Sequence, residues 1–179
     1  MFPNDAPPTR IETDRLVLRP PGPDDADAIY QGINDFEVVS MLARTPWPYL
    51  LEHAASFVTS AAGLDQTAGR EFSIVHRVHG LIGGCGFHSS PGERFVQMGY
   101  WVARAHWGQG YATEAAEAAL LWARDGWGRR AVGAGHFVEN PASGRVLVKV
   151  GMLYTGVVAP LRCEARGAEF PARKLVWLA

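Results

Sequence analysis

Residues 96–125 (VQMGYWVARAHWGQGYATEAAEAALLWARD) constrain the fold of this chain more than any other stretch. The segment from Val96 to Val102 predicts a strand, the sequence Trp-Gly-Gln-Gly at 107–110 predicts a tight turn, and a long helix is expected to begin near Tyr111. A strand that leads through such a turn into a helix gathers free backbone N–H groups at the positive end of a helix dipole. Glycines allow positive φ angles and a close approach of the backbone to a ligand. We therefore expect this turn to bind a phosphate or pyrophosphate group.

The turn matches neither of two well-known phosphate-binding motifs. A P-loop needs Lys followed by Ser or Thr after its last glycine, and that pair follows no glycine run in this chain. The dinucleotide fingerprint needs a third glycine, whereas Gly110 is followed by Tyr111-Ala112-Thr113. A Gly-x-Gly turn on its own leaves an ordinary structural turn as the alternative to a ligand site.

Composition and charge limit the class of protein. The chain has 179 residues and a formal net charge of −1, which argues against nucleic acid as a partner. No apolar run approaches the roughly 18 residues that a membrane span requires, and the start lacks the apolar core of a signal peptide. Cys85 and Cys163 lie in unrelated segments and indicate no disulfide framework. We expect a cytoplasmic protein with a flexible lead over residues 1–10 and a single domain over residues 11–179.

The remaining patterns predict an alternation of helices and strands. Alanines along the helix after the glycine turn favour close packing against a sheet, and the order β-α-α-α-β-β-β-α-β-α-β-β indicates a mixed α/β sheet with helices on both faces. The predicted strands are 11–19, 71–78, 81–88, 94–102, 131–137, 153–162 and 170–178, and the predicted helices are 24–33, 37–43, 50–62, 111–126 and 140–150.

Segments in four parts of the chain carry a family resemblance. They are Thr13-Asp14-Arg15-Leu16-Val17-Leu18-Arg19, Asp24 to Ala28, Gly99-Tyr100-Trp101-Val102 with Trp107 to Ala115, and Asn140-x-x-Ser143 with Lys149-x-Gly151-Met152. In this order they resemble the opening strand, first helix, coenzyme A motif and last helix of the Gcn5-related N-acetyltransferase (GNAT) superfamily. Within it, the chain is most similar to the RimJ/RimL-like branch of ribosomal-protein N-terminal acetyltransferases.

The resemblance implies a fold, a donor and an acceptor. The fold is α/β (α+β), with a mixed, mostly antiparallel seven-stranded sheet splayed between strands 4 and 5 and helices on both faces. The donor is acetyl-CoA, no metal is required, and the acceptor is a primary amine of a protein N-terminus or of a small molecule. The pantetheine arm is expected between the strands 96–102 and 131–137. The residues implied at the cofactor are Val102, Ala103, Trp107, Gly108, Gln109, Gly110, Tyr111, Ala112, Thr113, Asn140 and Ser143.

Acyl transfer to an amine needs an acid and an oxyanion site. The tetrahedral intermediate needs hydrogen-bond donors, which backbone N–H groups near Val102 or Ala103 are expected to supply, and the departing thiolate benefits from a proton. Many superfamily members use a Tyr midway along the last helix, where this chain has Leu147. In the RimL-like branch a Ser in the Asn-x-x-Ser motif replaces it, so the resemblance implies Ser143 as the catalytic acid. The alternative is that Ser143 only satisfies backbone groups in the first turn of its helix.

The sequence leaves the general base open. The acceptor ammonium must lose a proton before it can attack, and relatives often carry an acid just before the Gly-Tyr-Trp segment, where this chain has Gln97. Glu71, His88, Glu93 and His136 are candidates, and an unperturbed His has the most suitable pKa. A chain of water molecules, or binding of the neutral amine, would remove the need for a dedicated base.

Aromatic and metal-ligating residues give two further hypotheses. Trp47, Tyr49 and Trp101 are expected to line an acceptor groove together with Glu71 and His88, with packing in the core as the alternative. A zinc site of His76, His79, Cys85 and His88 is disfavoured, because positions 76 and 79 on an extended strand point to opposite faces. Cys85 is interpreted as a small buried apolar residue.

A second function remains open beside catalysis. Because Leu147 and Gln97 replace possible acid and base positions, the same fold could serve as a non-catalytic acyl-CoA sensor or an interaction module. A phosphate-binding protein unrelated to coenzyme A would require the other matching segments to be coincidental. The sequence is compatible with a monomer or a homodimer.

Overall fold

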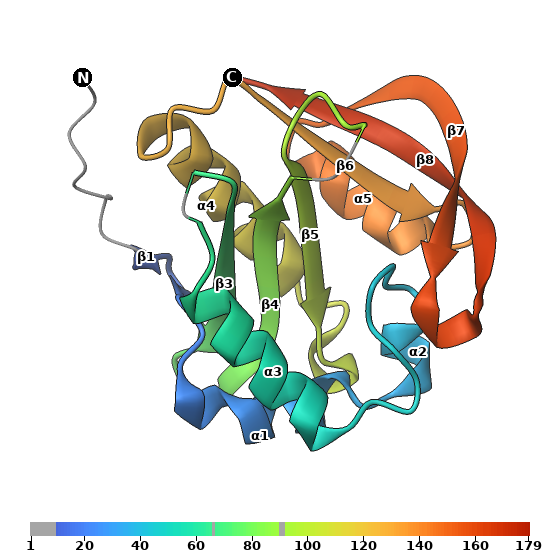
Figure 1. The fold of residues 1–179 in the computed structure, drawn as a ribbon. Helices are drawn as coiled ribbons and strands as arrows, with labels where there is room; N and C mark the ends of the chain where they lie inside the picture. Colours follow the sequence, from blue (N-terminus) through green and yellow to red (C-terminus); the bar gives the residue numbers. More distant parts are fainter. Residues whose placement is uncertain (1–9, 66, 90–91) are drawn as a thin grey trace.

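A central sheet organises the computed structural model, which describes residues 10–65, 67–89 and 92–179. The sheet has eight strands in the order β1-β2-β3-β4-β5-β6-β8-β7 (Figure 1). The strands are β1 (Ile11–Glu12), β2 (Leu16–Arg19), β3 (Gly69–His76), β4 (Gly80–His88), β5 (Gln97–Val102), β6 (Ala131–Phe137), β7 (Leu153–Cys163) and β8 (Ala168–Leu178). The helices are α1 (Ala26–Ile33), α2 (Phe36–Val39), α3 (Leu51–Ala62), α4 (Tyr111–Asp125) and α5 (Pro141–Lys149).

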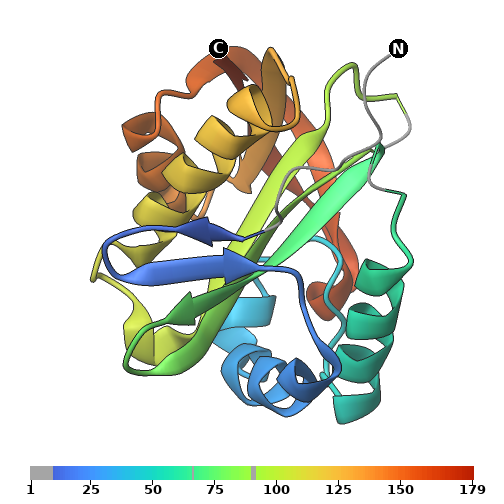
Figure 2. The same ribbon diagram turned by 90° about the vertical axis from the view of Figure 1, so that its left-hand side faces the viewer.

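Helices cover both faces of the sheet, as predicted. We call the face toward α1 and α3 the front face and the face toward α4 and α5 the back face (Figures 1 and 2). The back face holds the larger core, where alanines of α4 allow the helix to approach the strands closely. The fully buried members of this alanine set are Ala115, Ala116, Ala119 and Ala123. The front face holds a smaller core formed by α1, α2 and α3 with Trp101.

Strands β5 and β6 separate along their length, which confirms the predicted splay. They run parallel and pair only at Gln97 with Gly133 and at Met98 with Ala134. Beyond these pairs β6 continues antiparallel to β8, and Figure 1 shows β5 and β6 diverging. The sheet therefore opens between β5 and β6 from Gly99 onward.

The predicted first strand is wrong in one respect, because the segment 11–19 folds as two strands and raises the strand number from seven to eight. The Thr13 side chain accepts a hydrogen bond from the backbone N–H of Leu16, and the Thr13 N–H donates to the Leu16 carbonyl. These bonds reverse the chain between β1 and β2, which pair antiparallel. The turn brings Arg15 toward α4.

The predicted helix 37–43 is also shorter than expected. Helix α2 ends at Val39, because the N–H groups of Met41 and Leu42 donate three residues back, to Val38 and Val39, and the carbonyl groups that follow bind the β7–β8 turn. The Glu164 N–H donates to the Ala43 carbonyl, and Cys163 Sγ donates to the carbonyl of Ser40. This contact brings the end of the last hairpin to the front face of the sheet. The predicted lead lies outside the described residues except for Arg10.

No helix in the described part of the chain is both long enough and apolar enough to cross a bilayer.

Candidate functional site

The turn before α4 has the backbone conformation that an anion site needs. Gly108 and Gly110 have φ angles of 74° and 83°, in the left-handed region that glycine favours, and Gly110 is the N-cap of α4. A Cβ at Gly108 would meet no atom within 4 Å, so the turn faces open space. The first hydrogen bond of the helix runs from the Glu114 N–H to the Gly110 carbonyl, which leaves the N–H groups of residues 111–113 without an intrahelical acceptor. These donors are suited to bind a phosphate group.

A contact from the β1–β2 turn fixes this site. Arg15 Nη1 donates to the Gln109 carbonyl at 3.0 Å, and its guanidinium forms an ion pair with Glu114 at 2.6 Å. The Thr13 hydroxyl donates to the same carboxylate at 2.6 Å. Burial alone would raise the pKa of Glu114, but the hydrogen bonds from Thr13 and Arg15 lower it below its usual value. Sequence reasoning missed this contact because its partners lie in distant segments of the chain.

Backbone groups of β5 face the opening beside β6. The Ala103 N–H donates to the Ile82 carbonyl at 2.8 Å, so it is used within the sheet. In an antiparallel ladder the backbone groups alternate in direction, and this bond therefore turns those of Tyr100 and Val102 away from β4. The Val102 carbonyl accepts a hydrogen bond from Trp107 Nε1 at 2.6 Å. Of the two predicted oxyanion donors, the Val102 N–H is the one that faces the opening.

Two hydroxyl groups meet across the opening. The Tyr100 hydroxyl on β5 lies 2.8 Å from Ser143 Oγ on α5 and donates to the Ser143 carbonyl at 3.1 Å. Burial raises the pKa of Tyr100 to about 12, so the phenol stays protonated near neutral pH. Asn140 Oδ1 accepts the Ser143 N–H at 3.1 Å and caps α5, while Leu147 is buried in the back core. Sequence reasoning found Ser143 and Asn140 but not Tyr100.

Three glycines line the front face of the sheet beside the opening, and we call them the glycine floor. A side chain at Gly84, Gly86 or Gly99 would lie on this face, and the space that each glycine leaves has different surroundings. A Cβ at Gly86 would overlap the Glu71 carboxylate, and one at Gly84 would lie 2.8 Å from Trp101 Nε1. A Cβ at Gly99 would meet no atom within 4 Å. The structure therefore brings Glu71 and Trp101 together around an open position at the start of the splay.

The other predicted acceptor residues are more dispersed. His88 contacts Arg44 at 3.2 Å on the same face as Glu71. Trp47 is 42% exposed and packs edge-on against Phe36, with ring centroids 5.4 Å apart. Tyr49 is buried in the front core, so for Tyr49 the alternative of core packing holds.

The parity argument against a shared histidine site is wrong for His76 and His79. Strand β3 ends at His76, whose Nδ1 accepts the N–H groups of Val78 and His79, and the two rings stack with centroids 4.5 Å apart. The ring of His76 also lies 3.2 Å from the Tyr111 hydroxyl beside the α4 turn. Within the described ranges, no group of at least three His, Cys, Asp or Glu side chains is arranged to hold a metal ion. Cys85 is buried, as its interpretation as a small apolar residue required.

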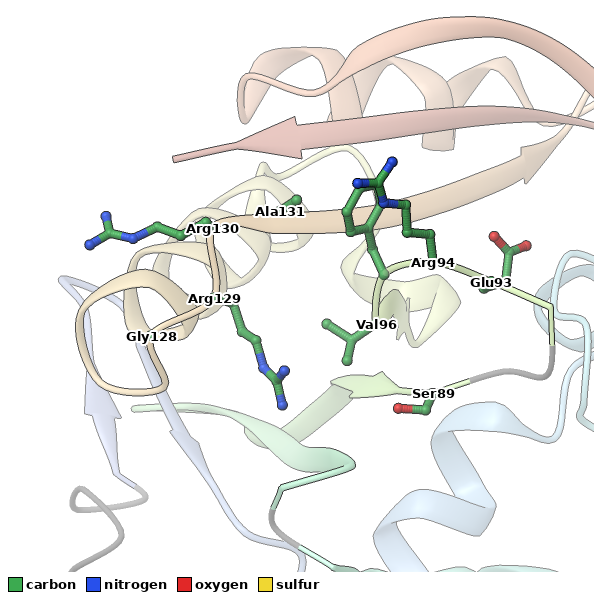
Figure 3. A pocket seen from close by; sticks show the side chains of 9 residues that line it. Ser89, Glu93, Arg94, Val96, Gly128, Arg129, Arg130 and Ala131 are labelled. Atoms are coloured by element: carbon green, nitrogen blue, oxygen red, sulfur yellow. The ribbon is translucent and has the colours of Figure 1, made fainter. Parts of the chain in front are cut away.

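Two surface hollows lie away from these residues. One, of about 450 Å³, lies near the starts of β5 and β6, where Glu93, Arg94, Arg129 and Arg130 line it (Figure 3). The other, of about 500 Å³, lies between α5 and the β7–β8 hairpin. Neither is lined by Glu71, Ser143 or the α4 turn.

Comparisons with known proteins agree with this architecture. Residues 15–153 match the family model described as "Acetyltransferase (GNAT) domain". The "Uncharacterized N-acetyltransferase YoaA" of Bacillus subtilis (strain 168) is 31% identical over 150 residues, which cover 83% of this chain and 85% of that protein. The "Uncharacterized N-acetyltransferase p20" of Bacillus licheniformis is 32% identical over 109 residues, covering 60% of this chain and 61% of that protein.

Solved structures show the same fold. Mycobacterium smegmatis RimJ in complex with CoA-disulfide superposes with a TM-score of 0.84 at 19% identity, covering 97% of this chain and 89% of that chain. RimL, a ribosomal L7/L12 α-N-protein acetyltransferase in complex with coenzyme A, superposes with a TM-score of 0.79 at 20% identity, covering 94% of this chain and 97% of that chain. The matches to the family model and to YoaA show that this chain is an acyltransferase that belongs to the acetyltransferase (GNAT) family.

Proposed function

We propose that this protein transfers the acetyl group of acetyl-CoA to a primary amine, which is a protein N-terminal α-amine or the amine of a small molecule. The observation that supports this best is the arrangement of three features along β5: the glycine turn before α4, the backbone groups of Tyr100 and Val102 that face away from β4, and the Tyr100–Ser143 hydroxyl pair. The turn suits an anion, the hydroxyl pair can donate a proton, and the opening between β5 and β6 lies between them. The RimJ and RimL structures, which are complexes with CoA-disulfide and coenzyme A, support the same donor.

The residues along this line suit the parts of acetyl-CoA. The N–H groups of residues 111–113 and the glycine turn bind the pyrophosphate, with Arg15 adding positive charge beside them. The backbone of Val102 and its neighbours pairs with the pantetheine arm, and Asn140 contacts the cofactor from the start of α5. Acetyl-CoA supplies the activated acetyl thioester, and no metal takes part.

Ser143 and Tyr100 act together in proton transfer to the leaving sulfur. Ser143 Oγ donates its proton, Tyr100 passes its own hydroxyl proton to Ser143 Oγ to replace it, and Tyr100 then regains a proton from solvent. The raised pKa of Tyr100 keeps that replacement proton in place at neutral pH. The Val102 N–H donates to the carbonyl oxygen of the acetyl group as negative charge develops there.

Calorimetric titration with acetyl-CoA tests the donor site. We expect micromolar binding by the wild-type protein and no measurable binding by Gly110→Asp, because the aspartate brings a negative charge into the anion site. Gly128→Asp is the matched control, since Gly128 also has a positive φ, of 68°, and lies at the far end of α4. Equal loss of binding in both variants would point to strain in the backbone and would contradict the anion site.

A thiol-release assay over a panel of amines and N-terminal peptides tests the transfer itself. Turnover that requires both acetyl-CoA and an amine supports the proposed reaction and ranks the two acceptor classes. Acetyl-CoA binding without turnover on any member of the panel would overturn it in favour of the acyl-CoA sensor.

A further inference from the structure

The geometry points to Glu71 as the general base of this site, with the acceptor amine entering over the front face of the sheet above Gly99. This inference rests on the proposed acetyl transfer and assigns the residue that the sequence left open.

The position of the Glu71 carboxylate follows from the glycines around it. Glu71 pairs with Gly86 across β3 and β4, and its Oε2 occupies the place that a side chain at Gly86 would fill. Gly86 in turn pairs with Gly99 on β5, where the front face is open. The Glu71 carboxylate therefore lies over Gly86 on β4 and is directed toward Gly99 on β5.

The proposed base and the proposed acid lie on opposite faces of the sheet, with Glu71 at the front and Ser143 at the back. The last pair between β5 and β6 is Met98 with Ala134, so the opening begins at Gly99. Gly99 and Tyr100 are adjacent, and adjacent residues of a strand point to opposite faces. An amine above Gly99 reaches the opening from the front, while the Tyr100–Ser143 pair reaches it from the back.

The surroundings of Glu71 leave it available to accept a proton. Within the described residues, no hydrogen bond or ion pair to its carboxylate is formed. Burial raises the pKa of Glu71 to about 7, and the charge of Arg44 acts in the opposite direction. On the adjoining strand, burial and the charge of Glu71 raise the pKa of Cys85, which stays a neutral thiol. A carboxyl group with a pKa near the working pH is ionised in a large fraction of the molecules and still has enough affinity for a proton to act as a base.

The other candidate bases are less suited by their contacts. Burial, together with the nearby Arg44 guanidinium, lowers the pKa of His88 to about 4, so His88 has little affinity for a proton at neutral pH. Glu93 forms an ion pair with Lys174 at 2.9 Å. His136 uses both ring nitrogens, since Nδ1 donates to the Phe137 carbonyl at 2.7 Å and Nε2 accepts from the Tyr154 hydroxyl at 3.0 Å.

The proton balance of the reaction fits this assignment. Glu71 takes one proton from the bound ammonium, which gives the nitrogen the lone pair it needs to form the N–C bond. The nitrogen loses its second proton to solvent as the C–S bond breaks. The sulfur gains a proton from Ser143, which Tyr100 reprotonates, and Tyr100 regains a proton from solvent. Glu71 passes its proton to solvent, so the net products are the amide, the thiol and one proton.

Glu71→Gln is the direct test, with Glu93→Gln as the matched control at the far end of the same face. In the wild type, kcat/KM for an amine of high pKa should fall as the pH drops below about 7, because the base is then protonated. In Glu71→Gln we expect kcat to fall by about 100-fold and this inflection to disappear. Acetyl-CoA affinity should stay within twofold in both variants, and Glu93→Gln should keep the wild-type profile.

Gly99→Ala tests the acceptor path independently of Glu71. The added methyl group meets no atom within 4 Å, so the fold should be unchanged, but the methyl occupies the open position and should raise KM for the amine. Wild-type turnover and pH profile in Glu71→Gln would overturn the assignment of the base, and an unchanged KM in Gly99→Ala would overturn the path. Failure of the wild type to bind acetyl-CoA would instead remove the proposed function.

Discussion

At the scale of single residues, the candidate site contains a contacting pair, Tyr100 and Ser143, of which the sequence analysis identified only Ser143. Ser143 and Asn140 stand in a motif, and their spacing of three residues matches a capped first turn. Tyr100 stands in a strand pattern that assigns it no role, although its hydroxyl lies 2.8 Å from Ser143 Oγ. Chemistry that depends on such a pair should respond to the loss of either hydroxyl group.

We predict that Ser143→Ala lowers kcat by about 100-fold, because the leaving sulfur loses its proton donor. Tyr100→Phe should lower kcat to a lesser extent, because Ser143 remains but is no longer reprotonated by its neighbour. Steady-state kinetics of thiol release would measure both effects.

Tyr154→Phe is the control for these two variants. It removes a hydroxyl that also contacts a side chain, His136 Nε2 at 3.0 Å, and that lies against Gly144 of α5 rather than Ser143. It should leave kcat near the wild-type value. If Ser143→Ala also turned over normally, Ser143 would be only a helix residue that satisfies backbone groups.

The assignment of Glu71 shows what single positions cannot reveal. In the sequence Glu71 is one acid on a predicted strand, equivalent to several others. Burial raises its pKa, and the register of β3 and β4 sets it opposite Gly86. The alternating glycines of β4 were visible in the sequence, and they are the signal that could have located this floor.

At the scale of elements, local patterns predicted most helices and strands, and the errors involve one local turn and one contact between distant segments. Helix α4 begins at Tyr111 and ends just before Gly126, where its glycines indicated. The split of the segment 11–19 into two strands comes from a local turn closed by Thr13 and Leu16, which the strand pattern did not reveal. The segment after α2 binds Cys163 and Glu164, which lie far along the chain and which no local pattern contains. The glycine turn before α4 could be predicted, but the contact of Arg15 with it could not.

We predict that Arg15→Ala weakens acetyl-CoA binding by about tenfold, equivalent to about 1.4 kcal/mol. The variant removes the bond to the Gln109 carbonyl and the ion pair with Glu114, so the turn loses its support and a nearby positive charge. Calorimetry would measure the change. Arg10→Ala is the control, because Arg10 is exposed and pairs with Glu12 away from the turn. Equal affinities in the wild type and Arg15→Ala would show that the glycine turn is rigid without this contact.

At the scale of the whole molecule, the sheet consists of two parts joined by a short ladder. Strands β1 to β5 form one part and β6 to β8 the other, and they pair only through residues 97–98 and 133–134. The back core, the Tyr100–Ser143 contact and the contact between Ala43 and Glu164 add to this connection. A ligand that lies along the opening contacts both parts at once, so its binding should stabilise the arrangement of the whole sheet.

We predict that acetyl-CoA slows amide hydrogen exchange on both sides of the opening. A ligand present at about 100 times its Kd stabilises the folded state by about 2.7 kcal/mol. Protection should therefore extend beyond residues 107–113 to residues 100–102 and to the first turn of α5. Gly110→Asp, which should not bind, should show no added protection in any segment.

Protection confined to the α4 turn would mean that the ligand is held by its phosphates alone and does not enter the splay. Protection of both sides would support a ligand that lies in the opening, which the proposed acid and base approach from opposite faces of the sheet.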